Sequence, residues 1–339
     1  MQQDERIDLA AQNARRNLTR REFVRKLGVA TGSAGMITAA FTGCTLSTSQ
    51  RAEASEAMVD ALGKVPKVKC SKRLGGMEMS RIIICQDWAG DLFDPAVAAG
   101  MNFVHKAGYF RTVPEALKKL PRESYYVDTT VDNTSPGHDP TNFDEAYNQV
   151  KSELDRTGLK YFDVFRAHYG WNTLNSFNKG DNASYRAFEK LKKEGLVKYF
   201  GVSQHTGGGY EKYADMLNAQ IDSGLIHTMQ LWISYNTSAE ELAAMEKAHN
   251  AGINIIAMKV YAHGSGKMRG DAAKLTELKS DGMVGRAGLR YVLGLKGANG
   301  KPFVDAAVTN LRNFNMFEEN VGSVAAKVAM ADGLSYHVA

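Results

Sequence analysis

Cysteine is scarce in this chain, with only Cys44, Cys70 and Cys85 among 339 residues. Three cysteines cannot build a disulfide framework or a cysteine-rich metal site, so both of these classes are excluded. Two interpretations remain for the later pair. Cys70 and Cys85 form a single bridge in an oxidising compartment, or they are two independent small core residues.

The net charge of the chain is also small. The formal net charge is +5, with 23% charged and 44% hydrophobic residues, which is an ordinary globular balance. Part of the positive excess lies near the N-terminus, at Arg15, Arg16, Arg20, Arg21, Arg25 and Lys26. No basic stripe with interleaved aromatic residues follows, so we do not expect nucleic acid as a partner.

The basic N-terminal segment is followed by a weakly apolar one. Residues 18–44 are "LTRREFVRKLGVATGSAGMITAAFTGC". The apolar stretch is too short and too weakly hydrophobic for a transmembrane span. The segment resembles a twin-arginine export signal, which implies the twin-arginine export machinery as a partner and a periplasmic or otherwise extracytoplasmic location. The other interpretation is a basic amphipathic helix with an accidental pair of arginines.

The end of this signal has two interpretations. Phe41-Thr42-Gly43-Cys44 is similar to a lipoprotein box, which would tether the protein to a membrane through Cys44. Cleavage near Ala52-Glu53-Ala54 would instead release a soluble protein. Residues 1–66 are therefore expected to be a signal peptide and flexible leader.

From residue 67 onward, short β-rich runs alternate with helical patterns. Eight strands with helices between them predict an α/β fold of the (β/α)8 TIM-barrel class, as a single domain over residues 67–339. The predicted strands are Arg81–Cys85, Asn102–Lys106, Tyr125–Thr130, Asp163–His168, Lys198–Ser203, Thr228–Ile233, Asn254–Met258 and Ala306–Asn310.

Several helix boundaries follow from local signals. Helical patterns are predicted to end at Gly158, Gly195 and Gly252, and Ser238 with Glu241 forms the pattern of a capping box. Residues 74–81, "LGGMEMSR", predict a small hairpin over the bottom of the barrel. In this fold the catalytic groups are expected at the C-terminal ends of the strands.

Five stretches, in this order, carry a family resemblance: "RLGGMEMSRIII", "AGMNFVHKAGYF", "GLKYFDVFRAHY", "FEKLKKEGLVKYFGVSQHT" and "LRNFNMFEEN". Together they resemble the aldo/keto reductase family from about Val68 to Val324. The resemblance implies hydride transfer between NADP(H) and a carbonyl or alcohol substrate. It also implies a tyrosine proton donor supported by an aspartate, a lysine and a histidine.

These catalytic positions are only partly kept. The histidine is present as His168, whereas the tyrosine position falls at Phe110, with Tyr109 one residue earlier. The aspartate position holds His105 and the lysine position holds Thr130. The resemblance therefore implies an altered active site with His168, Tyr109 and His105 as candidate catalytic residues. His105 is either an acid–base residue or a packed histidine in a site no longer used.

More of the cofactor-binding positions of the family are kept. Ser203 and Gln230 match the family residues, whereas Gln204 replaces an asparagine and Asn310 stands where the family has a glycine. The aromatic residue that stacks on the nicotinamide is Tyr235 or Trp232. By resemblance, the candidate residues for binding NADP(H) are Ser203, Gln204, Gln230, Tyr235, Arg312, Glu319 and Asn320.

A metal site is an alternative in the same place. His105, His168 and His205 lie near strand ends, with Asp87 and Asp128 close to the same mouth. Imidazoles with one carboxylate suit zinc or iron, but no tight His-x-His spacing supports such a site.

Three functional hypotheses follow. The first is an exported oxidoreductase of the aldo/keto reductase type. The second is a non-catalytic barrel that binds a small molecule or serves as a subunit of an envelope complex. The third is a metal-assisted enzyme using the same mouth.

Overall fold

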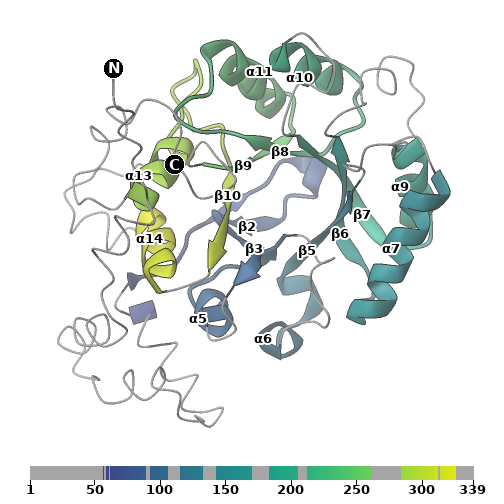
Figure 1. Cartoon of the computed structure of the whole chain (residues 1–339), viewed down its shortest axis with the longest axis horizontal. Helices are drawn as coiled ribbons and strands as arrows, with labels where there is room; N and C mark the ends of the chain where they lie inside the picture. The colour runs from purple at the N-terminus through teal and green to yellow at the C-terminus, as the bar shows by residue number, and fades with distance from the viewer. Residues whose placement is uncertain are drawn as a thin grey trace, which may run out of the picture.

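Eight parallel strands close a barrel with helices around its outside (Figure 1). The computed structural model describes residues 56, 59–60, 62–88, 92–105, 115–132, 143–169, 183–204, 212–260, 284–311 and 314–325. The order around the barrel is β10-β3-β4-β5-β6-β7-β8-β9. The strands are β3 (Ile82–Trp88), β4 (Phe103–Val104), β5 (Tyr126–Asp132), β6 (Phe162–Tyr169), β7 (Val197–Gln204), β8 (Thr228–Trp232), β9 (Asn254–Met258) and β10 (Ala306–Leu311). Each overlaps a predicted strand, and the (β/α)8 prediction is confirmed.

The helices follow the strands as the sequence predicts. They are α5 (Phe93–Ala98), α6 (Glu115–Lys118), α7 (Phe143–Thr157), α9 (Ala183–Lys193), α10 (Tyr213–Asp222), α11 (Ala239–Asn250), α13 (Val284–Leu293) and α14 (Phe314–Val324). Ser238 caps α11 in a complete capping box with Glu241. Gly158 and Gly195 follow α7 and α9 with φ of 69° and 75°, a conformation that favours glycine.

A hairpin covers the N-terminal end of the barrel. β1 (Lys67–Lys69) pairs antiparallel with β2 (Glu78–Ser80), with Val68 opposite Met79. The predicted hairpin is confirmed, but its first arm begins at Lys67, earlier than residues 74–81 alone would indicate. Cys70, just after β1, is buried, and no disulfide joins it to Cys85.

The interior of the barrel has two layers with different chemistry. Its lower layer is an apolar cluster beneath which the hairpin packs, formed by Leu74, Met79, Ile83, Phe103, Val164, Ile256 and Ala306. Side chains alternate across a strand, so residues two positions later face the same interior. On β4, β5 and β6 that step leads from Phe103, Tyr126 and Val164 to His105, Asp128 and Arg166. A polar layer therefore lies directly above the apolar one.

A buried carboxylate near the N-terminal end of the barrel links the neighbouring strands β5, β6 and β7. Asp163, at the start of β6, accepts hydrogen bonds from Val127 N of β5 at 3.0 Å and from Arg122 Nη2 at 2.8 Å. Lys198 Nζ of β7 lies 3.1 Å from the other carboxylate oxygen. Buried at 1% exposure, this carboxylate compensates its desolvation with several donors.

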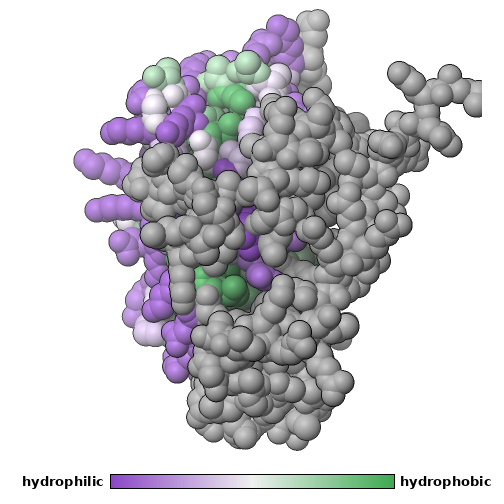
Figure 2. All heavy atoms as spheres, turned by 90° about the vertical axis from the view of Figure 1, so that its left-hand side faces the viewer, coloured by the Kyte–Doolittle hydropathy of each residue, from purple (hydrophilic) through white to green (hydrophobic). Residues whose placement is uncertain are grey.

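Figure 2 shows hydrophilic side chains gathered along the left-hand edge of one face, with smaller hydrophobic groups beside them. Across the residues that the structure describes, no helix has the length and apolar character needed to cross a membrane. The predicted export signal, Cys44 and most of the leader lie outside the described residues.

Candidate active site

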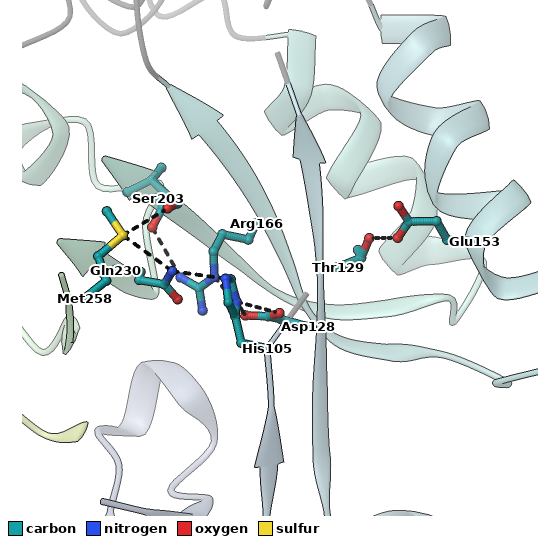
Figure 3. Close-up of polar contacts among 9 residues, drawn as sticks. His105, Asp128, Thr129, Glu153, Arg166, Ser203, Gln230 and Met258 are labelled. Carbon is teal, nitrogen blue, oxygen red and sulfur yellow. Dashed lines mark hydrogen bonds and ion pairs between the residues drawn. The ribbon is translucent and has the colours of Figure 1, made fainter. Parts of the chain in front are cut away.

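A buried histidine and a buried aspartate pair at the upper layer of the barrel (Figure 3). His105, directly after β4, places Nδ1 2.9 Å and 3.0 Å from the two carboxylate oxygens of Asp128 on β5. The two residues are 6% and 1% exposed. The carboxylate fixes the orientation of the imidazole ring, as in other buried acid–base pairs.

A buried arginine completes this charged group. Arg166 Nε of β6 lies 2.9 Å from Asp128 Oδ2, and its Nη1 donates to the carbonyl of Val202 at 3.2 Å. The arginine is fully buried. Among the described residues, Nη2 has no hydrogen-bond partner. One carboxylate therefore lies between a permanent cation and a titratable ring.

The space for the guanidinium comes from a glycine on the next strand. A Cβ added to Gly201 of β7 would lie 3.1 Å from Arg166 Nη1 and 2.8 Å from a methyl group of Thr228. Both distances are too short for an ordinary contact. A larger residue at this position would displace the arginine or its neighbours.

Gln230 of β8 binds the other side of the imidazole. Its Nε2 lies 3.2 Å from His105 Nε2. Because Nδ1 faces a carboxylate, the neutral ring carries its hydrogen on Nδ1, and Nε2 accepts from the amide. A protonated ring would instead need an acceptor here, and Oε1 of Gln230 has no partner among the described residues. Rotation of the amide by a half-turn would supply that acceptor.

Two further side chains lie beside this amide. Gln230 Nε2 is 3.7 Å and Ser203 Oγ is 3.8 Å from the sulfur of Met258, which ends β9. His168 is opposite Ser203 in the register of β6 and β7, and Ser203 is opposite Gln230. His168 is 8% exposed and faces the interior two residues above Arg166. The structure therefore brings together four predicted residues: His105, His168, Ser203 and Gln230.

Two other predicted residues do not join this group. The side-chain Nε2 of Gln204 lies 2.8 Å from Met216 Sδ of α10. The backbone carbonyl of Gln204 accepts a hydrogen bond from the hydroxyl of Tyr213 at 3.0 Å. Alternation explains this placement, because the residue after the inward Ser203 faces the helices. Tyr235, the aromatic residue predicted to stack on the cofactor, is buried at 3% exposure.

Two of the three positions predicted for the adenosine end, Glu319 and Asn320, make contacts within the protein. Asn320 of α14 donates from Nδ2 to the carbonyl of Asn310 at 3.0 Å. Burial raises the pKa of Glu319 to about 7, although Arg286 and the backbone amides of Gly285 and Arg286 oppose that shift. Glu319 thus joins α14 to the first turn of α13, whose positive dipole end favours a carboxylate.

The remaining predicted residues lie outside the described part of the chain. These are Tyr109, Phe110, His205 and Arg312, together with the side chain of Asp87. Among the described side chains, no group of three or more histidine, cysteine, aspartate or glutamate residues could hold a metal ion.

Arg166 was missed by the sequence argument, and Asp128 was considered only as a metal ligand. Their signal lies in the sequence "DVFRAHY" and in "YYVDTTV", where a charged residue interrupts an apolar strand. Arg166 precedes His168 by two positions, and Asp128 precedes Thr130 by two positions. Charges on the inward face of a barrel strand are expensive unless paired, which predicts a partner.

Comparison with known proteins identifies the family. Residues 84–283, more than half of the chain, match the model of the aldo/keto reductase family. An aldo-keto reductase from Mycolicibacterium paratuberculosis is 30% identical over 91 residues, which cover 27% of this chain and 29% of that protein. The chain therefore matches less than a third of that relative's length.

Solved structures agree on the fold. An aldo-keto reductase from Bacillus halodurans in its holo form gives a TM-score of 0.57 at 18% identity, covering 81% of this chain and 98% of that one. An aldo-keto reductase complexed with NADPH gives 0.53 at 14% identity, covering 80% and 88%. With a closed barrel of eight parallel strands and a family model that matches more than half of its length, this chain belongs to the aldo/keto reductase family.

Proposed function

We propose that this protein is an oxidoreductase that interconverts a carbonyl and an alcohol with NADP(H), and that His105 is its acid–base residue. The observation that carries the proposal is the buried group of His105, Asp128 and Arg166 (Figure 3). His105 directly follows β4, whereas Asp128 and Arg166 lie inside β5 and β6, so the group forms the layer directly beneath the C-terminal mouth where barrel enzymes place their chemistry.

The energetic cost of this group supports a functional role. Removing a carboxylate and a guanidinium from water costs several kcal/mol for each ion, and an apolar layer of similar volume is often as stable. The same strands carry such an apolar layer two residues below, at Phe103 and Val164. A charged group here is therefore better explained by chemistry than by stability.

The residues present fit a nicotinamide. Ser203 and Gln230 would hold its carboxamide, since the buried Oε1 of Gln230 has no partner among the described residues and accepts an N–H. The cofactor, when bound, supplies or accepts the hydride. NADP(H) rather than NAD(H) is part of the proposal by family resemblance, as is the use of Arg312, Glu319 and Asn320 for the adenosine end.

His105 would handle the proton. In the reducing direction, Nε2 donates a proton to the carbonyl oxygen, and the alcohol leaves with that hydrogen. In the oxidising direction, the neutral Nε2 accepts the hydroxyl proton while Asp128 stabilises the resulting imidazolium. Either step requires the amide of Gln230 to give up its present contact with Nε2. His168, and Tyr109 by resemblance, would orient the substrate oxygen.

The test uses purified full-length protein and separates cofactor binding from chemistry. His105→Gln is expected to lower kcat by about 10²–10⁴-fold, the usual contribution of general acid–base catalysis. The same variant should bind NADPH, measured by fluorescence titration, within about twofold of the parent affinity. The matched control is His249→Gln, because His249 lies outside this group, with its Nδ1 3.7 Å from Asp305 Oδ2.

Two results would overturn this assignment. Full activity in His105→Gln would remove the proton role from this residue. Failure of the parent protein to bind NADPH would remove the oxidoreductase function and leave a non-catalytic barrel that binds another small molecule or an envelope partner.

We also propose that residues 1–66 direct the protein out of the cytoplasm through the twin-arginine export machinery. The support is the sequence from Thr19 to Lys26, with its arginine pair, before a weakly apolar stretch. Changing Arg20 and Arg21 to lysine should leave the protein in the cytoplasm on cell fractionation. Cys44→Ala should move it from the membrane to the soluble periplasmic fraction if the cysteine is lipidated, and unchanged fractionation would contradict the tether.

A further inference from the structure

Lys259, directly after β9, has an unusual backbone conformation. Its φ is 54°, and it is the only residue other than glycine with positive φ in the part of the chain that the structure describes. The left-handed region is unfavourable for an ordinary residue, because its Cβ crowds the following carbonyl oxygen. Such residues cluster at binding sites, where a particular side-chain direction offsets the cost.

The conformation turns the lysine toward a neighbouring strand. Met258 faces the barrel interior beside Gln230, so a regular strand would point the following side chain toward the helices. Instead, Lys259 Nζ lies 4.7 Å from the ring centroid of Trp232, which ends β8. Burial lowers the pKa of Lys259, so the ammonium lies where water is partly excluded.

The strand register places Lys259 above the polar layer of the candidate active site. Trp232 is opposite Met258 in the strand register and two residues above Gln230, whose amide contacts His105. Two residues of strand rise by about 7 Å, which is the span of a small organic molecule. A molecule with its reacting carbon near His105 would therefore bring a second polar group to Lys259.

We propose that Lys259 and Trp232 form a subsite for the carboxylate of the substrate, so that the substrate is a small oxo acid or hydroxy acid. This inference rests on the proposed oxidoreductase function. A lysine ammonium pairs with a carboxylate as a compact charge, and the indole ring beneath it keeps the ammonium in place. A phosphate group of the cofactor is the other source of a negative charge, and the test separates the two.

The experiment compares two aldehydes that differ only by a para carboxylate group, 4-carboxybenzaldehyde and benzaldehyde, with the full-length enzyme. Lys259→Met is expected to raise KM for the carboxylated aldehyde about tenfold or more, and KM for benzaldehyde by less than about twofold. Lys259→Arg should restore most of the difference. Lys247→Met is the control, because Lys247 lies on α11 in an exposed pair with Asp222.

Direct binding distinguishes failure of the subsite from failure of the function. Calorimetric titration with benzoate needs no turnover, and Lys259→Met should weaken it about tenfold. Benzoate binding that depends on Lys259 in a protein without reductase activity would support the subsite while overturning the function. Equal KM changes for both aldehydes would overturn the subsite. A loss of NADPH affinity in Lys259→Met, with unchanged discrimination between the aldehydes, would also overturn it and assign the charge to the cofactor phosphate.

Discussion

The two layers inside the barrel use the same strands for opposite purposes. In the lower layer, Phe103 and Val164 pack against the hairpin with almost no exposed surface. Two residues later on the same strands, His105 and Arg166 share the carboxylate of Asp128 with equally little exposure. Burial is therefore the same in both layers, whereas only the lower one gains its stability from apolar contact.

This contrast shows how a barrel separates folding from chemistry. An apolar layer closed by β1 and β2 can supply the free energy that the charged layer consumes. Because side chains repeat every two residues, one strand contributes to both layers without a change of direction. Substitutions in the lower layer should therefore change stability, and substitutions in the upper layer should change charge balance and activity.

The largest expected effect is in the lower layer. Phe103→Ala removes a fully buried ring and should lower the free energy of unfolding by about 3–5 kcal/mol, because the cavity cannot collapse between packed strands. Urea denaturation measures the loss. At a temperature where the variant is folded, its kcat should match that of the parent, and a loss below about 1.5 kcal/mol would contradict the assigned packing.

A smaller loss is expected from breaking the charge balance above. Asp128→Asn leaves Arg166 as an uncompensated buried cation and should lower the free energy of unfolding by about 3 kcal/mol. The double variant Asp128→Asn with Arg166→Met should recover most of that stability without recovering activity. Additive losses in the double-mutant cycle would show that the two residues are not coupled. Asp222→Asn, which breaks an exposed pair, should change stability by less than about 0.5 kcal/mol.

A substitution at Gly201 tests how much space surrounds the guanidinium of Arg166. Gly201→Ala should lower the free energy of unfolding by about 2 kcal/mol, since its new methyl group meets Arg166, Thr228 and Val164. Gly195→Ala is the matched control: it meets no atom within 4 Å but has φ of 75°, and should cost about 1 kcal/mol. A loss no greater than that of the control would show that the guanidinium has free space.

The smallest effect lies outside the barrel, at Glu319. Its pKa is raised from 4.5 to about 7 in the folded protein, so the protonated form stabilises the fold. This contribution is full below pH 4.5 and is lost as the pH rises through about 7, because the unfolded chain releases the proton first. Between pH 5 and pH 8, the free energy of unfolding measured by urea denaturation should therefore fall by about 1–2 kcal/mol less in Glu319→Gln than in the parent protein. Parallel pH profiles of parent and variant would contradict the shift.

The sequence predicts the barrel well because its signals are local. Alternating strand and helix patterns, the stops at Gly158 and Gly195 and the capping box at Ser238 depend only on near neighbours. The pairing of His105 with Asp128 and Arg166 is not local, since it depends on strand register and on the room left by Gly201. The outward turn of Gln204 follows from alternation and was predictable, whereas the left-handed backbone at Lys259 has no sequence signal.

The contact between Gln230 and His105 has a thermodynamic consequence. The same amide must offer Nε2 to a neutral ring and Oε1 to a protonated one, and it cannot do both. Any ligand that engages one end of this amide therefore changes what the other end can offer to the ring. The contact with the ligand and the contact with His105 are coupled, and the coupling is reciprocal: each changes the free energy of the other by the same amount.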